Sequence, residues 1–404
     1  MSLLESGEFM LVVPRFFISC FLAFIGGHVM NYSVIFYAQE VLQSDLLAGL
    51  GFFLSFGAAP LLVGWYAGAL CDRASPTLLV VLSQLLFVIG ASLLLVLVSQ
   101  DLPSFLSVGV FLGAATCSGI AWCFIAPARL ALLGRLVALK DLHRASVLFN
   151  VLVMLGFGVA PIMIALLRQE YGWHGPIGLI LLLFFAASLL LVGVRVERPV
   201  IPAASILSDV RNGFSYVAKH LLIRQLLLVT LIVYSVMGPV QVILPRFAID
   251  SLGLTAMDRG LLLAIMALAL FVGGVICMTL GQRLPQGKAI IGSLLISSLL
   301  MVGLGCSQSM LEAAVWLFFA GMLAGVSVSL IVAALQLNSQ DQFRGRVMSF
   351  YTISTQVLPA TSGFLCGLLL EWVSPAQGLV VAACVLIVLG AIALWRMTVM
   401  RSYG

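Results

Sequence analysis

The sequence predicts an all-α integral membrane protein whose twelve transmembrane helices form two pseudo-symmetric six-helix bundles. Of its 404 residues, 62% are hydrophobic types and only 9% are charged, whereas a soluble domain carries about 25% charged residues. Apolar stretches about 20 residues long, the length that a helix needs to cross the hydrocarbon layer, recur along the chain. The Lys and Arg residues concentrate in alternate connections between these stretches, which supports an even number of spans.

The predicted spans follow one another along the chain with short connections. The stretch from Ile177 to Val194 is a clear example, because it holds no charged residue. Continuous apolar runs of this length exclude an outer-membrane barrel, whose strands show short alternating patterns. We expect the spans at residues 14–38, 47–70, 77–98, 104–126, 146–167, 176–195, 224–247, 260–280, 289–306, 312–335, 347–370 and 378–396.

The start of the chain and its cysteines give two further expectations. Met1–Leu11 is short and acidic, and no small-residue cleavage site follows it, so we expect the first apolar stretch to be a span rather than a signal peptide. The eight cysteines lie in or at the ends of apolar segments and form no Cys-x-x-Cys pair. We therefore expect no disulfide, no metal site and no cofactor.

The distribution of basic residues predicts the orientation. Of the 20 Lys and Arg residues, only Arg168, Arg246 and Arg259 fall on one side of the predicted bilayer. The positive-inside rule makes the other, arginine-rich side cytoplasmic. We therefore expect both termini to lie in the cytoplasm, and we expect a multi-pass protein of the bacterial inner membrane. Because the net charge of +5 is explained by topology, we expect no nucleic-acid partner.

A polar stretch in the middle of the chain predicts the domain organisation. We expect an N-terminal six-helix bundle at residues 1–196, a cytoplasmic linker at 197–223 and a C-terminal six-helix bundle at 224–404. Within the linker, the mixed segment from Ser208 to His220 is typical of an amphipathic helix on the membrane surface. A plain linker without such a helix is the alternative.

The loop after span two carries a specific motif. It contains Gly68, Leu70, Asp72 and Arg73, and it resembles the loop-2/3 signature of the major facilitator superfamily, Gly-x-Leu-x-Asp-Arg, although the glycine and second basic residue that usually follow are replaced. Residues 279–283, after span eight, repeat part of it, as duplicated halves would.

Two further stretches resemble one branch of this superfamily. Residues 127–144 and 344–349 are similar to drug and siderophore exporters, including macrolide-efflux and enterobactin-exporter-like proteins. The resemblance covers essentially the whole chain. It implies a substrate site near the bilayer midplane, between two halves that rock around it, and it implies export.

The resemblance also implies that Asp72 faces the start of span eleven, where Arg346 lies. We hypothesise that Asp72 bridges to Arg346, or to that helix end, when the cytoplasmic side is closed. Gly68 and Arg73 complete this gating motif, together with Arg144 in the corresponding loop after span four. The alternative is that Asp72 only caps a turn.

Span five contains Gly156 and Pro161 in a pattern that resembles a degraded form of the exporters' antiporter signature. Small residues let helices approach closely, and Pro161 removes a backbone donor and can kink the span. Ordinary helix packing is the alternative to a specific role in antiport.

The resemblance places spans one, four, seven and ten around a central cavity. Aromatic walls with a few polar groups suit amphipathic organic molecules. On span one, the candidates recur at spacings of 3 and 4 and so share one helical face. The candidate substrate-binding and coupling residues are Phe24, His28, Asn31 and Tyr32 on span one, Trp122 on span four, and Tyr234 and Gln241 on span seven.

His28 is the only ionisable residue that the sequence places deep inside a span, because all Asp and Glu residues fall at span ends or in loops. Ionisable groups inside spans are rare and usually functional, and histidine titrates near neutral pH. We interpret His28 as a proton relay or a substrate ligand, with a hydrogen-bonded structural histidine as the alternative. Glu40, nearer the periplasmic mouth, is a second candidate for proton coupling.

The sequence lacks the residues that an intramembrane enzyme or an ATP-driven pump would require. The spans hold no His-Glu-x-x-His or Gly-x-Ser-x-Gly motif and no paired embedded carboxylates, so an intramembrane enzyme is not expected. No Gly-x-x-x-x-Gly-Lys-Ser/Thr loop is present to bind ATP. We expect a monomeric, proton-coupled exporter of a small amphipathic molecule, either drug-like or a siderophore, in contact with membrane lipid. A passive facilitator or a lipid or lysolipid flippase of the same fold is the alternative.

Overall fold

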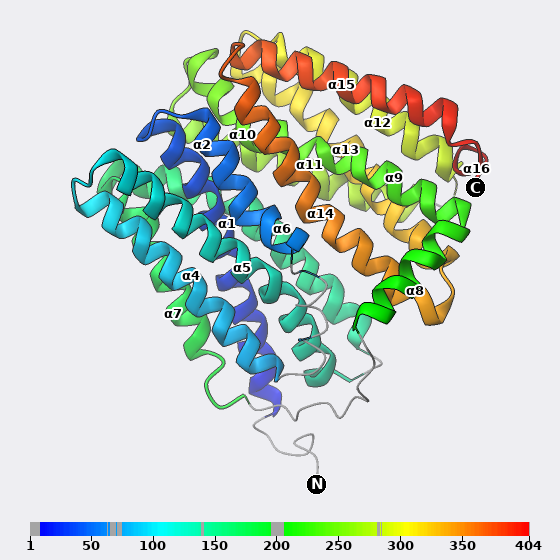
Figure 1. The fold of residues 1–404 in the computed structure, drawn as a ribbon, viewed down its shortest axis with the longest axis horizontal. Helices are drawn as coiled ribbons and strands as arrows, with labels where there is room; N and C mark the ends of the chain where they lie inside the picture. The colour runs from blue at the N-terminus through cyan, green and yellow to red at the C-terminus, as the bar shows by residue number, and fades with distance from the viewer. Residues whose placement is uncertain are drawn as a thin grey trace. The chain divides into compact units, whose positions relative to one another are not determined.

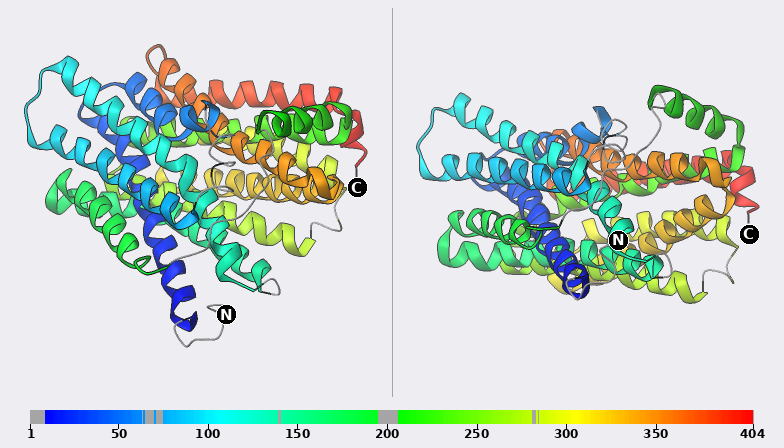
Figure 2. Two further views of the ribbon diagram at one scale, coloured as in Figure 1. Left: turned by 60° about the horizontal axis from the view of Figure 1, so that its bottom comes forward. Right: turned by 90° about the horizontal axis from the view of Figure 1, so that it is seen from below.

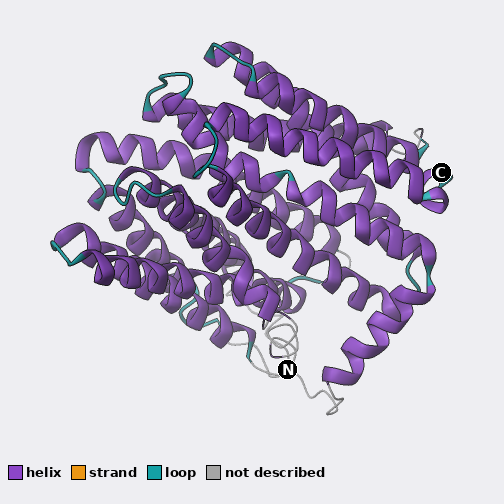
Figure 3. Cartoon of the chain, turned by 45° about the horizontal axis from the view of Figure 1, so that its top comes forward, coloured by secondary structure: helices purple, strands orange, loops and turns teal. Residues whose placement is uncertain are grey.

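The computed structural model describes residues 9–62, 64, 70, 75–138, 141–194, 206–280, 283 and 285–403. This part of the chain contains helices and no strands, as Figure 3 shows. It packs as two compact units. The first consists of Met1–Val34 and Leu54–Ala203, and the second of Ile35–Phe53 and Ala204–Gly404. The second unit therefore includes an early piece of the chain, the end of the first helix and the start of the next.

The first unit is built mainly from long apolar helices, labelled in Figure 1. Helices α4 and α5 run side by side as a hairpin (Figure 2), and α7 packs against α4. The unit contains most of α1 (Phe9–Glu40), nearly all of the π-helical segment η2 (Phe53–Ala58), and α4 (Pro76–Ser99), α5 (Ser104–Leu136), α6 (Leu142–Tyr171) and α7 (His174–Leu189).

The second unit contains the remaining helices. Its core pairs are α11 with α13, α12 with α13, and α12 with α15, and Figure 1 shows α12 and α15 lying side by side. Its helices are α2 (Asp45–Phe52), α8 (Ile206–Lys219), α9 (Leu221–Ser235), α10 (Met237–Asp250), α11 (Ala256–Leu280), α12 (Gln286–Gly305), α13 (Met310–Asn338), α14 (Asp341–Leu369), α15 (Pro375–Arg396) and α16 (Thr398–Arg401).

Local sequence explains several helix boundaries. Proline cannot donate the bond to the carbonyl four residues earlier, and Pro239 lies four residues after Ser235, where α9 ends and α10 follows. Helix α15 begins with Pro375 in its first turn and a capping box between Ser374 and Gln377. Such a box satisfies backbone N–H groups that have no partner inside the helix.

Each of the twelve predicted spans overlaps a helix. Ten helices in the described part of the chain are long and apolar enough to cross a membrane, with α9 and α10 together forming one of them. The other two predicted spans correspond to α7, which has only 16 residues, and to α14, which is more polar at its start. The protein is therefore an all-helical, multi-pass membrane protein.

The structure extends span four beyond its predicted end at residue 126. Helix α5 passes through Pro127 and continues to Leu136. As a result Arg129, which the sequence places among the cytoplasmic residues, lies inside a helix and is completely buried. His28 is thus not the only ionisable group enclosed by the spans.

The predicted amphipathic segment before span seven is helical in the structure, as α8. Its Tyr216 ring stacks on Phe343 with centroids 4.3 Å apart, and the Tyr216 hydroxyl accepts a hydrogen bond from the backbone N–H of Gln340 at 3.0 Å. These contacts attach α8 to the start of α14 within the second unit.

Candidate functional site

An aromatic cluster in the first unit surrounds His28. The imidazole ring of His28, on α1, lies 5.1 Å from the Trp122 ring on α5 and 5.4 Å from the Phe157 ring on α6, measured between centroids. The His28 side chain is only 6% exposed, and neither of its ring nitrogens has a hydrogen-bond partner. Three helices thus enclose one unpaired imidazole.

Trp122 is the centre of this cluster. Its indole also meets the edges of Phe56 and Phe87, at centroid distances of 5.5 and 5.8 Å. On the α1 side, a Cβ at Gly27 would lie 2.9 Å from the indole. The lack of a side chain at Gly27 therefore allows Trp122 to lie directly against α1, beside His28.

The other candidates on α1 differ in their surroundings. The Tyr32 ring lies 5.8 Å from the Phe157 ring and so borders the same cluster. Asn31 is buried and its side-chain oxygen accepts a 2.8 Å hydrogen bond from Ser55. Phe24 meets Phe149 edge to face at 5.1 Å. Phe24, Asn31 and Tyr32 are thus all buried along α1. Tyr32 contacts Phe157 of the His28 cluster, whereas Phe24 contacts Phe149.

The cluster contains several polar atoms without partners. Besides the two His28 nitrogens, the indole N–H of Trp122 is buried and makes no hydrogen bond, and the same holds for the hydroxyl of Ser118, four residues before Trp122 on α5. Buried polar atoms are usually satisfied, and ligand sites combine aromatic walls with a few such groups. The arrangement has the composition of a site for a partly polar molecule.

The span-seven candidates lie in the second unit. Tyr234, on α9, shares a 2.6 Å hydrogen bond with the hydroxyl of Tyr351 on α14. Gln241, on α10, is buried. The two tyrosine hydroxyls therefore partner each other, and Tyr351 is a residue that the sequence alone did not single out.

A cluster of charged residues in the second unit joins residues 35–53 to the helices that follow Ala204. The Glu40 carboxylate lies 2.6 Å from the Arg259 guanidinium, which is nearly fully buried and stacks over the Phe36 ring at 3.9 Å. Glu40 and Arg259 are 219 positions apart in sequence. No sequence pattern signals such a pair.

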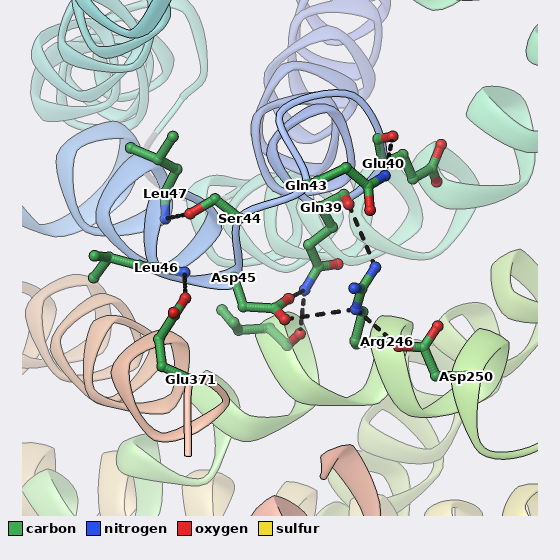
Figure 4. A network of polar contacts seen from close by, with 11 residues as sticks. Gln39, Glu40, Gln43, Ser44, Asp45, Leu46, Leu47, Arg246, Asp250 and Glu371 are labelled. Carbon is green, nitrogen blue, oxygen red and sulfur yellow. Dashed lines mark hydrogen bonds and ion pairs between the residues drawn. The ribbon is translucent and has the colours of Figure 1, made fainter. Parts of the chain in front are cut away.

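A second part of this cluster is shown in Figure 4, around Arg246 on α10. Its guanidinium contacts the carboxylates of Asp250, at 2.9 Å, and Asp45, at 3.5 Å. The Gln39 amide donates to Asp45 and to the Val242 carbonyl, both at 2.9 Å. Polar contacts thus hold the start of α2 and the end of α1 on α10.

The predicted gating motif is described only in part. Gly68, Asp72 and Arg73 lie outside the described residues, so the bridge from Asp72 to Arg346 stays a prediction. Arg144 is exposed at the start of α6. The Arg346 guanidinium lies 5.3 Å from the centroid of the Phe343 ring.

The predicted packing residues lie on α6. A Cβ at Gly156 would come within 2.9 Å of the α1 backbone at Phe24, so α1 and α6 approach closely there. Pro161 lies inside α6, which continues as a helix to Tyr171. Gly156 precedes Phe157, so this close approach helps to bring the Phe157 ring to His28.

Comparisons with solved structures identify the fold. A bacterial homologue of the human lysosomal transporter Spinster, in an inward-facing and unoccupied conformation, matches with a TM-score of 0.74 and 14% identity, over 98% of each chain. POT family transporters in complex with a thioalcohol-conjugated peptide and with 5-aminolevulinic acid each match with a TM-score of 0.72 and 15% identity, over 96% of each chain. No curated protein matches the sequence at a significant level.

The sequence itself carries a family match over nearly its whole length. The profile of the Major Facilitator Superfamily matches residues 16–310 and, in a second match, residues 226–403. The two matches overlap and together extend through both units. The chain therefore belongs to the major facilitator superfamily of membrane transport proteins.

Proposed function

We propose that this protein is a secondary active transporter that exports a small amphipathic organic molecule, drug-like or a siderophore, by alternating access and proton antiport. In this proposal it works as a monomer in the bacterial inner membrane, with both termini in the cytoplasm. The site consists of His28, Trp122, Phe157 and Tyr32, and the proton is carried by His28.

The observation that carries this proposal is the unpaired imidazole inside an aromatic cluster. A histidine in the membrane that only stabilises the fold would be expected to hydrogen-bond a neighbour. His28 makes no such bond, although Trp122 and Phe157 enclose it. It is thus available to bind a proton or a polar group of the substrate, and the rings around it offer contact area for an apolar body.

Export and antiport are supported by sequence resemblance. Residues 127–144 and 344–349 resemble drug and siderophore exporters, and the stretch around Gly156 and Pro161 resembles their antiporter signature. We include in the proposal a cytoplasmic gate in which Asp72 pairs with Arg346.

The test uses purified protein in liposomes with an imposed pH gradient. Candidate substrates are added in parallel, namely ethidium as a drug-like cation and 2,3-dihydroxybenzoate as a siderophore-like catechol acid, and both substrate movement and proton release are recorded. An exporter of this kind accumulates one of them against its gradient, and the accumulation stops when a protonophore removes the pH gradient. If the substrate instead reached only the same concentration on both sides of the membrane, with or without the pH gradient, the protein would be a passive facilitator.

The role of His28 is tested by His28→Ala across a pH series. His174→Ala is the matched control, because His174 is exposed on α7 and contacts only the Ser99 hydroxyl among the interactions seen. We expect His28→Ala to flatten the pH dependence of transport, while His174→Ala leaves it unchanged. An unchanged pH profile in His28→Ala would assign proton transfer to another group.

A further inference from the structure

A buried arginine near the His28 cluster has no anionic partner among the residues that the structure describes. Arg129 lies on α5 and its side chain is completely enclosed in the first unit. One terminal nitrogen, Nη1, donates to the Ser19 hydroxyl at 3.2 Å and to the Cys20 sulfur at 3.4 Å. The other two nitrogens, Nε and Nη2, are buried without a hydrogen-bond partner.

The contacts of Arg129 compensate its charge poorly. Ser19 already donates its own proton to the Ala187 carbonyl of α7, at 2.7 Å, so its hydroxyl offers the guanidinium only a neutral acceptor. Among the described residues, the ion pairs lie in the second unit, between Arg246 and Asp45 or Asp250 and between Arg259 and Glu40, and Arg129 takes part in none of them. A guanidinium remains charged under all ordinary conditions, and a buried charge without a counter-charge is strongly unfavourable.

Arg129 shares a helical face with the aromatic cluster. Ser118, Trp122 and Arg129 are separated by four and seven residues on α5, which places them on one side of the helix. Seven residues correspond to about 10 Å along the axis. On α1 the facing residues run in the opposite order, because His28 contacts Trp122 while Ser19 and Cys20 contact Arg129.

The α1–α5 interface thus has two chemically different ends. One end is aromatic, with His28 and Trp122 beside Phe157 of α6, and the other carries the two guanidinium nitrogens of Arg129 that make no hydrogen bond. Nε and one terminal nitrogen form one side of the guanidinium fork, which matches the two oxygens of a carboxylate or phosphate. The separation of the ends matches a molecule with an apolar body and an acidic head.

We infer that the transported molecule is an amphipathic organic anion, whose apolar body lies against the His28 cluster and whose oxyanion binds Arg129. This inference rests on the proposed function and narrows it. It favours an acidic compound, such as a carboxylate or an acidic catechol, over the amine-bearing cations that the same exporter branch could carry. Its recognition chemistry is that of an oxyanion on an apolar chain, whether free in solution or part of a lipid.

The experiment measures binding to the purified full-length protein by titration calorimetry in a neutral detergent. The probes are three compounds of the same shape: 6-phenylhexanoate, the neutral 6-phenylhexanol and the cationic 6-phenylhexylamine. We expect the anion to bind the unaltered protein at least tenfold more tightly than the other two. Equal binding of the three probes, or binding of none, would overturn the inference without the use of any variant.

Variants then locate the anion site. Arg129→Gln should weaken 6-phenylhexanoate binding by about thirtyfold or more, the usual effect of removing one member of a buried charge pair, while 6-phenylhexanol binding changes little. Arg129→Lys should recover part of the loss. The control Arg396→Gln removes an exposed arginine of α15 and should leave binding unchanged. Equal binding of the anion by Arg129→Gln and the unaltered protein would exclude Arg129 as its ligand.

A competition experiment distinguishes the two possible sources of such an anion, a lipid headgroup and a soluble acid. Lysophosphatidylglycerol that competes with 6-phenylhexanoate only when Arg129 is present would identify a lipid headgroup as an occupant, whereas competition by 2,3-dihydroxybenzoate alone would identify a soluble acid. Failure of the inference is distinguishable from failure of the proposed function. Gradient-driven export of ethidium in liposomes, with no anion selectivity in calorimetry, would preserve the exporter and refute the anion site.

Discussion

The Arg259 guanidinium and the Glu40 carboxylate form a 2.6 Å ion pair in which the arginine side chain is 2% exposed and the glutamate 18%. Glu40 is the last residue of α1 and Arg259 lies in the first turns of α11. The pair therefore fixes the end of the first helix within the second unit. Because little water reaches the pair, each charge depends on the other for its electrostatic stabilisation.

Removal of one partner should consequently be costly. We expect Arg259→Gln to lower the free energy of unfolding by about 3–5 kcal/mol, because it leaves the Glu40 carboxylate without its counter-charge. The double variant that also carries Glu40→Gln should recover at least half of this loss, since no buried charge then remains. Detergent-induced unfolding of the four proteins in a double-mutant cycle measures both effects. Additive losses in the double variant would show that the pair is not coupled.

The neighbouring pair of Arg246 and Asp250 should behave differently. Its members are four residues apart on α10, and their side chains are 26% and 40% exposed. Pairs of this kind contribute less than about 1 kcal/mol, and Arg246 keeps its contact with Asp45. Asp250→Asn should therefore change the unfolding free energy by less than about 1 kcal/mol, with high salt reducing the difference further. A loss as large as that of Arg259→Gln would mean that solvent does not screen this region.

Glycines at the contact between α2 and α14 give a prediction about packing. A Cβ at Gly49 would lie 2.8 Å from the Gly363 carbonyl oxygen and 3.1 Å from the Gly367 Cα. Backbone atoms cannot move aside as a flexible side chain can, so Gly49→Ala should destabilise the protein by about 1–3 kcal/mol. Thermal unfolding in detergent measures the change.

Gly292→Ala is the matched control for this substitution. Gly292 lies on α12 in the same unit, and a Cβ there would meet nothing within 4 Å. Alanine favours a helix over glycine by about 0.5–1 kcal/mol, so this control should be neutral or slightly stabilising. If both variants destabilised the protein equally, the close approach of α2 to α14 would not explain the result at Gly49.

The membrane class and the helical spans were predictable, because both follow from local properties. A stretch as apolar as Ile177–Val194 favours a helix that satisfies its own backbone polar groups, and α7 covers this stretch as far as Leu189. The spacing of His28 and Tyr32 likewise fixes a shared face on α1. What such patterns do not contain is the identity of the neighbour on another helix, such as Phe157 on α6.

Arg129 illustrates how local signals can mislead. The predicted span four ends at residue 126, just before Pro127 and the basic residues that follow it. In the structure α5 passes through Pro127. Beyond it, Arg129 donates to the Ser19 hydroxyl of α1, which itself donates to the Ala187 carbonyl of α7. Tertiary packing decided the boundary. The ion pair of Glu40 and Arg259 was likewise unpredictable, because tertiary packing brings together two residues that are 219 positions apart in sequence.

The last prediction separates the contribution of His28 to stability from its contribution to function. Its imidazole is buried with two polar nitrogens that no group satisfies, and the replacement of an unsatisfied polar group by an apolar one of similar size is neutral or stabilising. We expect His28→Leu to unfold at the same temperature as the unaltered protein or a higher one. Its transport should fall at least tenfold, because the proton or substrate contact is lost.

Asn31→Leu provides the contrast on the same helix. Asn31 accepts a hydrogen bond from Ser55, and its replacement leaves the Ser55 hydroxyl without this acceptor, which should cost about 1–3 kcal/mol. A site built for function is expected to be less stable than an apolar substitute, so stability gained together with transport lost would identify His28 as a functional residue. If His28→Leu were instead destabilised as much as Asn31→Leu, the histidine would be making a structural contribution, and a water molecule bonded to its ring nitrogens would be the first explanation to test.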